Sequence, residues 1–408
     1  MNKELSSFAA RLRDFILSEG RVPRVPDLKI RNGDSWNSSL RDFDSLALEL
    51  FALQFENNAD YRKICEARGL TPKVIEHWTQ IPAVPTSAFK ELELSCIPSE
   101  ERTAVFHSSG TTEQKPSRHF HCAESLAVYE ASLWTWFEKK CGVQSAECGV
   151  IILTPTPEQA PHSSLVHMFE TIRQKLGGVD VPASRAEFPG KLAADGSWTL
   201  DFDATLALLN SSLVTRHPSL LLGTAFSFVH LLDYLAERDL RVGLPAGSRV
   251  METGGYKNRS RSMPKAELHS LITERLGVPP KNIICEYGMS ELSSQAYDSV
   301  ASGKCQVTRN ATASCHPSPV TRHFCFPPWA RAQIISPETG REVADGETGL
   351  IRIFDLANIF SVAAIQTEDL GIRRGGGFEL LGRAQQAEPR GCSLMTNFAL
   401  RTLHFAFK

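Results

Sequence analysis

The stretch "FHSSGTTEQKPSRHF", Phe106–Phe120, carries the strongest indication of the fold that this chain adopts. Its centre, "SSGTT" (Ser108–Thr112), places four hydroxyl side chains around one glycine, and Lys115 and Arg118 follow. Bound phosphate groups require hydroxyl and backbone N–H donors on a backbone that can approach closely, with cations nearby. The stretch is not a Walker A loop, because the second glycine and the Gly-Lys-Ser/Thr ending are missing. On composition alone it also fits an ordinary polar turn.

On the C-terminal side of this stretch, short apolar runs alternate with helical segments. The runs "GVIIL", "SLLLG", "SRVMET" and "KNIICEY" are bounded by turn residues, as buried strands are. Helical periodicity lies between them, for example in "SSLVHMFETIRQKLGG". Strands that alternate with helices predict an α/β fold with doubly wound, mostly parallel sheets.

The chain divides into four predicted parts. Residues 1–100 form a helical N-terminal part of the core, with amphipathic patterns at 1–20 and 45–69. Residues 101–300 form the α/β core itself. Residues 301–382 are rich in proline, glycine and short β-type runs, which predicts a small β-rich subdomain. Residues 383–408 are too few for an independent domain and form a short C-terminal segment.

Composition and charge set limits on partners and compartment. The 408 residues are 42% hydrophobic and 22% charged, which is typical of a soluble globular protein. The net charge is −2, from 44 basic and 46 acidic side chains, so no global field selects nucleic acid. The longest apolar run, at 219–232, is interrupted by polar residues, and no membrane span is expected. Ten scattered cysteines and an N-terminus without signal-peptide character predict a cytoplasmic protein.

Three further motifs follow the opening stretch in a fixed order. They are "TGG" (Thr253–Gly255), "YGMSE" (Tyr287–Glu291) and "TEDLG" (Thr367–Gly371), the last followed by "LGR" (Leu381–Arg383). Each motif by itself is a weak signal. Together and in this order they resemble the acyl-adenylate-forming enzymes, a superfamily that includes acyl-CoA synthetases and the adenylation domains of peptide synthetases.

The resemblance implies ATP and Mg²⁺ as cofactors and assigns roles to individual residues. The "SSGTT" loop and the lysine after it would hold the ATP phosphates: Ser108, Ser109, Gly110, Thr111, Thr112 and Lys115. Two glycine turns and one aromatic ring would lie at the adenine: Gly254, Gly255, Tyr287 and Gly288. Glu291 would bind Mg²⁺, Asp369 would hold the ribose hydroxyls, and Arg383 would lie near the hinge.

A closer resemblance is to the acyl-protein synthetase subunits of bacterial fatty-acid reductase complexes. It is carried by "VPTSAFKE", "FHSSGTT", "TGGYKNRSR" and "GRAQQAEPRGCSL". It implies that a fatty acid and ATP form acyl-AMP, that the acyl group passes to an enzyme cysteine, and that a reductase or transferase protein accepts it. A homo- or hetero-oligomer is compatible with such a role. The resemblance also implies that the mobile C-terminal domain of full-length relatives is absent.

Two residues are predicted to complete the chemistry. Cys392, in "EPRGCSL", is the acyl carrier that the resemblance implies, and the neighbouring Arg390 would favour its thiolate form. Lys257, aided by Arg259 or Arg261, is the cation that we expect to replace the lysine of the missing domain. The alternative for Lys257 is a solvated basic loop, and the alternative for Cys392 is an unreactive thiol.

Several alternatives remain open at this level. A carboxylate–CoA ligase of the phenylacetate type would use the same first step, and a non-catalytic subunit that binds acyl chains or AMP would need no chemistry. The region around Cys305, Cys315 and Cys325 contains zinc-type ligands but lacks the close cysteine spacing of structural zinc sites. The sequence does not determine the acyl chain length.

Overall fold

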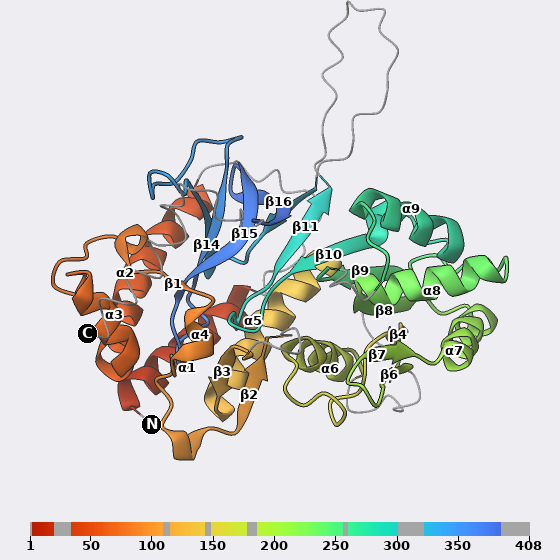
Figure 1. Cartoon of the computed structure of the whole chain (residues 1–408), viewed down its shortest axis with the longest axis horizontal. Coiled ribbons are helices and arrows are strands. Elements are labelled where there is room, and N and C mark those ends of the chain that lie inside the picture. The colour runs from red at the N-terminus through yellow and green to blue at the C-terminus, as the bar shows by residue number, and fades with distance from the viewer. Residues whose placement is uncertain are drawn as a thin grey trace, which may run out of the picture.

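The structure is a computed structural model that describes residues 2–19, 34–108, 115–142, 148–177, 186–255, 260–300 and 322–384. Over these residues the chain is an α/β protein built on a 12-stranded mixed sheet, with helices on both of its faces (Figure 1). The predicted fold class is therefore confirmed. Two short antiparallel hairpins lie outside the main sheet.

The described helices are α1 (Lys3–Glu19), α2 (Asp34–Asn57), α3 (Ala59–Ala67), α4 (Ala88–Glu91), α5 (Ala123–Cys141), α6 (Ser164–Gly177), α7 (Phe202–Thr215), α8 (Ala225–Glu237) and α9 (Lys265–Leu276). The main sheet contains β1 (Val84–Pro85), β4 (Gly149–Ile152), β5 (Ala186–Glu187), β8 (Ser219–Thr224), β9 (Arg249–Thr253), β10 (Ile283–Tyr287), β11 (Ala296–Val300), β12 (Arg322–Cys325), β13 (Ala330–Ile335), β14 (Thr348–Asp355), β15 (Ala364–Arg374) and β16 (Gly377–Arg383). The hairpins are β2 (Ala104–His107) with β3 (Arg118–His121), and β6 (Gly190–Leu192) with β7 (Trp198–Leu200).

The centre of the sheet is parallel, as the alternation of strands and helices predicts. Strands β5, β4, β8, β9 and β10 lie side by side in this order, and all their pairings are parallel. The carboxyl ends of neighbouring parallel strands meet at one edge of a sheet, where ligands of α/β proteins bind. The two motifs "TGG" and "YGMSE" begin at the ends of β9 and β10, so this topology brings them together.

Alternate residues of the central strands enter two different cores. In β8, Leu220 and Leu222 belong to the larger core, while Leu221 packs against α8 and α9 residues in a second core. Each strand contributes to both cores because its successive side chains point to opposite faces of the sheet. This two-sided burial explains why the strands read as continuous apolar runs.

The C-terminal strands continue the same sheet in antiparallel pairing. β10 pairs with β11, β11 with β12, and β12 with β16, and from there the sheet runs through β15 and β14 to β13. The short strand β1 joins β15, with Val84 opposite Ile365, so the N-terminal part is hydrogen-bonded to these strands. The division into four parts stays a prediction.

The N-terminal helices differ in one detail from the expected pattern. α1 buries its apolar face, as its periodicity predicts. The segment 45–69 was expected to form one helix, but α2 ends at Asn57 and α3 begins at Ala59. The break lies at Asn58, whose side-chain oxygen accepts the Tyr61 N–H at 3.1 Å and caps α3. A side chain that caps the backbone in this way competes with helix continuation.

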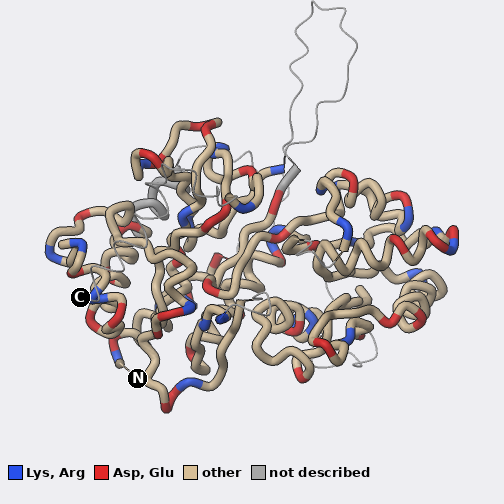
Figure 2. The backbone as a smooth tube through the Cα atoms, in the orientation of Figure 1, with Lys and Arg blue, Asp and Glu red and all other residues tan. Residues whose placement is uncertain are grey.

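Lysine and arginine are interspersed with aspartate and glutamate over the described chain (Figure 2), as expected from the near-zero net charge. Among the described residues, no helix has both the length and the apolar character that crossing a bilayer requires.

Candidate active site

The connection between β10 and β11 is the centre of the candidate site. It begins after Tyr287 and contains a turn that the Leu292 N–H closes on the Met289 carbonyl at 3.1 Å. Ser290 and Glu291 occupy the corners of this turn, and both are buried. The motif "YGMSE" is thus an ordered turn at the carboxyl end of a parallel strand.

The β2–β3 hairpin lies directly against this turn. At its loop end, the Ser117 N–H donates to the Ser108 hydroxyl at 3.0 Å, and the Ser108 N–H donates to the Ser117 carbonyl at 3.3 Å. From β3, His119 Nδ1 lies 2.8 Å from the Ser290 carbonyl oxygen, and the hydroxyls of Ser117 and Ser290 are 3.4 Å apart. The base of the predicted phosphate loop and the predicted metal-binding motif are therefore in contact, although 171 positions separate His119 from Ser290.

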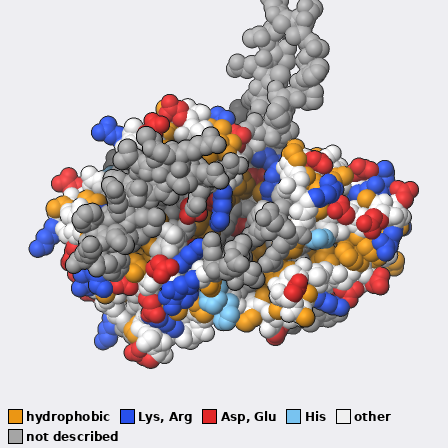
Figure 3. Space-filling model, viewed as in Figure 1, with side chains coloured by type: hydrophobic (Ala, Val, Ile, Leu, Met, Phe, Trp, Pro, Cys, Tyr) orange, Lys and Arg blue, Asp and Glu red, His pale blue; other side chains and the backbone are white. Residues whose placement is uncertain are grey.

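Histidine and basic side chains gather at the surface over this hairpin (Figure 3). The rings of His107 and His162 lie 4.7 Å apart. Lys115 lies 3.5 Å from Glu91, and Arg118 lies 3.7 Å from Glu93, so acidic side chains balance both cations. Burial, then the neighbouring His162 and Arg118, lowers the pKa of His107, which favours its neutral form.

Glu291 is a buried carboxylate with few polar partners. Only 5% of its surface is exposed, and its Oε2 accepts a hydrogen bond from the Ser290 hydroxyl at 3.0 Å. No lysine or arginine among the described residues forms an ion pair with it. Mg²⁺ in nucleotide sites is held by one or two carboxylates together with substrate phosphates and water. Glu291 therefore fits as the single protein carboxylate for such an ion.

Tyr287 and Asp369 are joined across the sheet. The Tyr287 hydroxyl donates to Asp369 Oδ2 at 2.8 Å, and Asp369 Oδ1 lies 3.9 Å from the guanidinium of Arg383. Asp369 on β15 is opposite Arg383 on β16 in the antiparallel register. Burial raises the pKa of Asp369, while the bond from Tyr287 and the charge of Arg383 oppose that rise. Three predicted site residues thus form one hydrogen-bonded and charged group.

The turn after β9 is tied to β10. Gly254 has a φ of +68°, a left-handed conformation that favours glycine. Just before it, the Thr253 hydroxyl donates to the carboxylate of Glu286, which precedes Tyr287. Burial raises the pKa of Glu286 to about 7, although the bond from Thr253 lowers it. A carboxyl group that titrates near neutral pH therefore connects the two motifs.

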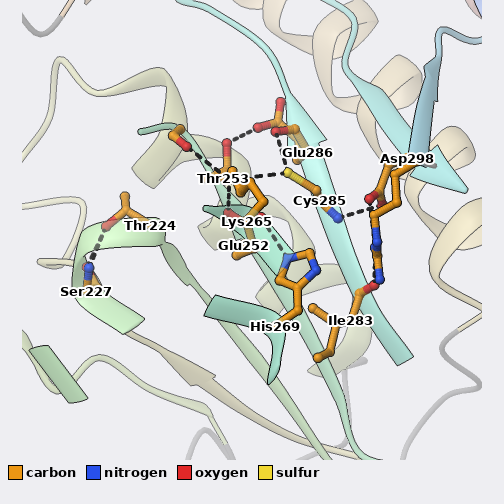
Figure 4. Close-up of polar contacts among 12 residues, drawn as sticks. Thr224, Ser227, Glu252, Thr253, Lys265, His269, Ile283, Cys285, Glu286 and Asp298 are labelled. Atoms are coloured by element: carbon orange, nitrogen blue, oxygen red, sulfur yellow. Dashed lines mark hydrogen bonds and ion pairs between the residues drawn. The ribbon is translucent and has the colours of Figure 1, made fainter. Parts of the chain in front are cut away.

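Beneath the same turn lies a charged cluster that the sequence did not point to (Figure 4). Lys265, the first residue of α9, pairs with the fully buried Glu252 and donates to the Gly254 carbonyl at 3.3 Å. Lys265 Nζ also lies 3.5 Å from Cys285 Sγ, and His269 Nε2 lies 3.1 Å from Glu252 Oε1. Burial alone would raise the pKa of Glu252, but Lys265 and His269 outweigh it and lower that pKa to about 2.

Lys265 and Glu252 escaped the sequence analysis because no local pattern marks them. They are thirteen positions apart, one at the start of a helix and the other on a strand. Their pairing depends on how α9 packs against β9 and β10. A buried glutamate inside the apolar run "RVMET" was the available signal, since such a residue requires a partner.

The described site residues fall into two groups. The structure brings together eight of them around the ends of β2, β9, β10 and β16 and the middle of β15: Ser108, Gly254, Gly255, Tyr287, Gly288, Glu291, Asp369 and Arg383. Lys115 is exposed and paired with Glu91. Arg261, one of the predicted helpers of Lys257, lies 2.8 Å from Asp233. Ser109, Gly110, Thr111, Thr112, Lys257, Arg259, Arg390 and Cys392 lie outside the described residues.

Only one cysteine of the region with zinc-type ligands lies within the described residues. Cys305 and Cys315 lie outside the described residues, and Cys325 is a free cysteine on β12. No group of three or more His, Cys, Asp or Glu side chains within the described ranges could hold a metal ion.

Comparison with known sequences gives a consistent result. The family model described as "Acyl-protein synthetase, LuxE" matches residues 186–401. A long-chain-fatty-acid–luciferin-component ligase of Aliivibrio fischeri is 24% identical over 375 residues, which is 86% of this chain and 86% of the relative. The ligase of the same name from Vibrio harveyi is 22% identical over 359 residues and 84% of each chain.

Solved structures of similar fold are acyl-adenylate-forming ligases. 2-Hydroxyisobutyryl-CoA ligase, in an open conformation with 2-HIB-AMP and CoA, matches with a TM-score of 0.60 and 14% identity. The match covers 91% of this chain and 82% of that ligase. The same enzyme in its thioesterification state gives a TM-score of 0.61 at 13% identity, over 89% of this chain and 73% of the ligase. At this level of identity the likeness is one of fold.

Proposed function

The chain belongs to the acyl-protein synthetase, LuxE, family, and from this premise we propose that it activates a long-chain fatty acid with ATP and then carries the acyl group on its own Cys392. The final acceptor is a partner protein, a reductase or transferase. The relatives named as long-chain-fatty-acid–luciferin-component ligases support the substrate class. The scattered cysteines favour a cytoplasmic location, where thiols stay reduced.

One observation supports the proposal: the turn at Ser290 and Glu291 contacts the loop end of the β2–β3 hairpin. The loop between Ser108 and Lys115 is rich in hydroxyl donors, and its base lies against the turn with the buried Glu291 carboxylate, which has no ion pair among the described residues. Phosphates with a bound Mg²⁺ require both features in one place. The Tyr287–Asp369 pair lies at the other end of the same motif, where the resemblance assigns adenine and ribose.

In the first step, a carboxylate oxygen of the fatty acid attacks the α-phosphorus of ATP. A P–O bond to the acyl oxygen forms, the bond to the β-phosphate oxygen breaks, and pyrophosphate leaves with its electron pair. The step moves negative charge between oxygens and needs little proton transfer, so positioning and charge neutralisation dominate catalysis. Bound Mg²⁺ would supply that neutralisation next to Glu291.

In the second step, the Cys392 thiolate attacks the acyl carbonyl of acyl-AMP. A thioester forms, and AMP leaves with the electron pair of the broken acyl–oxygen bond. Cys392 acts as the thiolate, since the thiol form is a poor nucleophile. In this proposal residues 383–408 form the short segment that brings the cysteine to the acyl-AMP.

Lys257 is proposed as the cation at the phosphates. Lys115 and Arg118 lie close to Glu91 and Glu93, which reduces their availability. Arg261 is paired with Asp233 and lies 3.8 Å from Glu267. Lys257→Ala is expected to slow acyl-AMP formation by at least about tenfold, as the loss of one charge-stabilising donor does. Arg241→Ala, which removes an exposed partner of Glu274, serves as control.

The decisive experiment measures pyrophosphate–ATP exchange with a panel of fatty acids and then examines the protein by intact mass spectrometry. We expect exchange that depends on the acid, and an added acyl mass that hydroxylamine removes. Cys392→Ser should keep the exchange and lose the hydroxylamine-labile acyl group. An acyl thioester that survives in Cys392→Ser would contradict the role of this cysteine.

A carboxylate–CoA ligase is the second candidate, because the fold likeness to 2-hydroxyisobutyryl-CoA ligase favours it. Such an enzyme would release acyl-CoA when CoA is added and would accumulate no acyl-protein. A non-catalytic subunit would bind ligand without any exchange of pyrophosphate. The same assays, run with and without CoA, separate the three functions.

A further inference from the structure

The turn that carries Glu291 is held by two residues far away in the chain, Asp355 and Asn358. Asp355 is the last residue of β14 and Asn358 lies in the segment that follows, and both are almost completely buried, with 0% and 1% exposure. Neither belongs to a motif that the sequence analysis identified. Both side chains hydrogen-bond to the backbone at or next to Glu291.

Asn358 holds Glu291 itself. Its side-chain amide donates to the Glu291 carbonyl oxygen at 2.7 Å and to the Val362 carbonyl at 3.2 Å. Its backbone oxygen accepts from the side-chain amide of Gln54 on α2 at 2.7 Å. The backbone of the predicted metal-binding residue is therefore connected through Asn358 to a helix of the N-terminal part.

Asp355 fixes the residues that follow Glu291. Its Oδ2 accepts the N–H groups of Ser293 at 3.0 Å and Ser294 at 2.8 Å. Its Oδ1 accepts the Ser294 hydroxyl at 2.7 Å and the Ala357 N–H at 3.0 Å. Three of these four donors, those of Ser293 and Ser294, fix the direction of the chain immediately after the turn.

The side of the turn before Glu291 is held as well. His119 and Ser117 of the hairpin contact Ser290, and the Ser290 hydroxyl donates to the Glu291 carboxylate. The turn is thus clamped by polar contacts on both sides. Burying polar groups is costly unless they are hydrogen-bonded, and among the side chains of this clamp Asn358 Oδ1 is the one buried atom without a partner in the described part of the chain.

We infer that Asp355 and Asn358 are positioning residues for Glu291, which act by fixing the backbone of the turn so that its carboxylate meets the cation of a metal–nucleotide complex. The inference rests on the proposed function for the identity of that complex. Outer residues that orient a metal ligand commonly change metal affinity or activity by about 10–100-fold when they are removed. Both side chains contact the backbone of the turn, so they act through Glu291 as positioning residues and not as catalytic ones.

The test compares two buried asparagines with similar hydrogen bonds. Asn358→Ala removes the donor to Glu291. The matched control is Asn282→Ala, because Asn282 is also buried (9% exposed) and its amide donates to a distant backbone carbonyl, that of Ser248, at 3.0 Å. Asn282 lies before β10, at the opposite end of that strand from the turn. The two variants lose the same type of hydrogen bond, and only one of them loses it at the turn.

The first readout is Mn²⁺ binding in the presence of a non-hydrolysable ATP analogue, measured by electron paramagnetic resonance. We expect Asn358→Ala to weaken Mn²⁺ binding about tenfold, while Asn282→Ala binds as the wild type does. Wild-type affinity in Asn358→Ala, or an equal loss in Asn282→Ala, would overturn the inference. This readout does not depend on turnover.

The second readout is pyrophosphate exchange as a function of Mg²⁺ concentration. Asn358→Ala should need about tenfold more Mg²⁺ for half-maximal exchange, with the KM for fatty acid unchanged. Wild-type protein that binds Mn²⁺–nucleotide but exchanges no pyrophosphate would remove the proposed function and leave this inference intact.

Folding of the variant is controlled separately. If Asn358→Ala does not fold, Ser294→Ala is compared with Asn282→Ala instead. This variant disturbs the fold less, since it removes only one of the four donors to Asp355. The expected loss of Mn²⁺ affinity is then about threefold, which corresponds to about 0.6 kcal/mol, within the range of one ordinary hydrogen bond. Unchanged affinity in Ser294→Ala would count against Asp355.

Discussion

The Tyr287 hydroxyl donates a 2.8 Å hydrogen bond to Asp369, a residue 82 positions further along the chain. This bond connects the end of the parallel core to the antiparallel strand β15. It also connects the two residues to which the resemblance assigns adenine and ribose. The bond fixes these two protein groups relative to each other before a nucleotide binds, and this lowers the entropic cost of binding.

Tyr287→Phe tests this connection. The variant keeps the ring and loses one hydrogen bond to a carboxylate, so we expect a stability loss of about 1 kcal/mol and a KM for ATP about fivefold higher. Chemical denaturation and pyrophosphate exchange measure the two effects. Tyr234→Phe is the control, because no hydrogen bond of its hydroxyl is found among the described residues and its ring stacks on Phe202. Equal effects in both variants would contradict the assignment.

Gly288→Ala tests the packing of the "YGMSE" turn. A Cβ at this position would overlap a carboxylate oxygen of Glu286, while its next neighbours lie 3.4 Å and 3.5 Å away, an ordinary contact. We expect a loss of about 1–2 kcal/mol, as for overpacked core positions. The double variant with Glu286→Ala should lose no more stability than Glu286→Ala alone. A double-mutant cycle by urea denaturation measures this coupling, and simple additivity would show that the clash is absent.

Lys265→Met tests the buried ion pair. It leaves the fully buried Glu252 with His269 as its remaining partner, and because the Lys265 side chain is 39% exposed we expect a loss below the about 3–5 kcal/mol of a fully buried pair. Adding Glu252→Gln should recover most of that stability, since the uncompensated charge is then gone. The exposed pair of Arg241 and Glu274 provides the control, where Arg241→Met should cost less than about 1 kcal/mol. Thermal unfolding of the three variants and the wild type decides between these expectations.

Glu286 predicts a pH dependence of stability. Its pKa is raised from 4.5 to about 7, so the folded state binds the proton more tightly than the unfolded state does. Its stabilising contribution is fully present below pH 4.5 and is lost as the pH rises to about 7, at no more than about 1.4 kcal/mol per pH unit. The difference in unfolding free energy between wild type and Glu286→Gln, measured from pH 4.5 to 8, should fall and then level off near pH 7. A difference independent of pH would refute the shifted pKa.

Much of the fold could be predicted from the sequence because its signals are local. Runs such as "SLLLG" are apolar on both strand faces, and the structure confirms them as central parallel strands. The break between α2 and α3 was missed because an asparagine in an otherwise helical pattern can either face solvent or cap a new helix. Only the packing of Tyr61 and its neighbours selects the cap.

The candidate site was predictable where its residues belong to contiguous motifs. Each of four residues lies in a short recognisable segment, and the packing of the hairpin and the sheet strands brings them together: Ser108, Tyr287, Glu291 and Asp369. Lys265 and Asn358 were not predictable, because their partners are Glu252 and the Glu291 backbone, distant in sequence and on other elements.

The sequence by itself therefore determined the class of fold, the order of the motifs and the chemistry that each motif offers, because periodicity and residue type are local properties. Only the tertiary structure decided which groups meet: Tyr287 with Asp369, Lys265 with Glu252, and Asn358 with Glu291. The physical reason is that side-chain periodicity specifies the face on which a residue lies. Its partner depends on strand order, register and helix packing, which the whole chain establishes together.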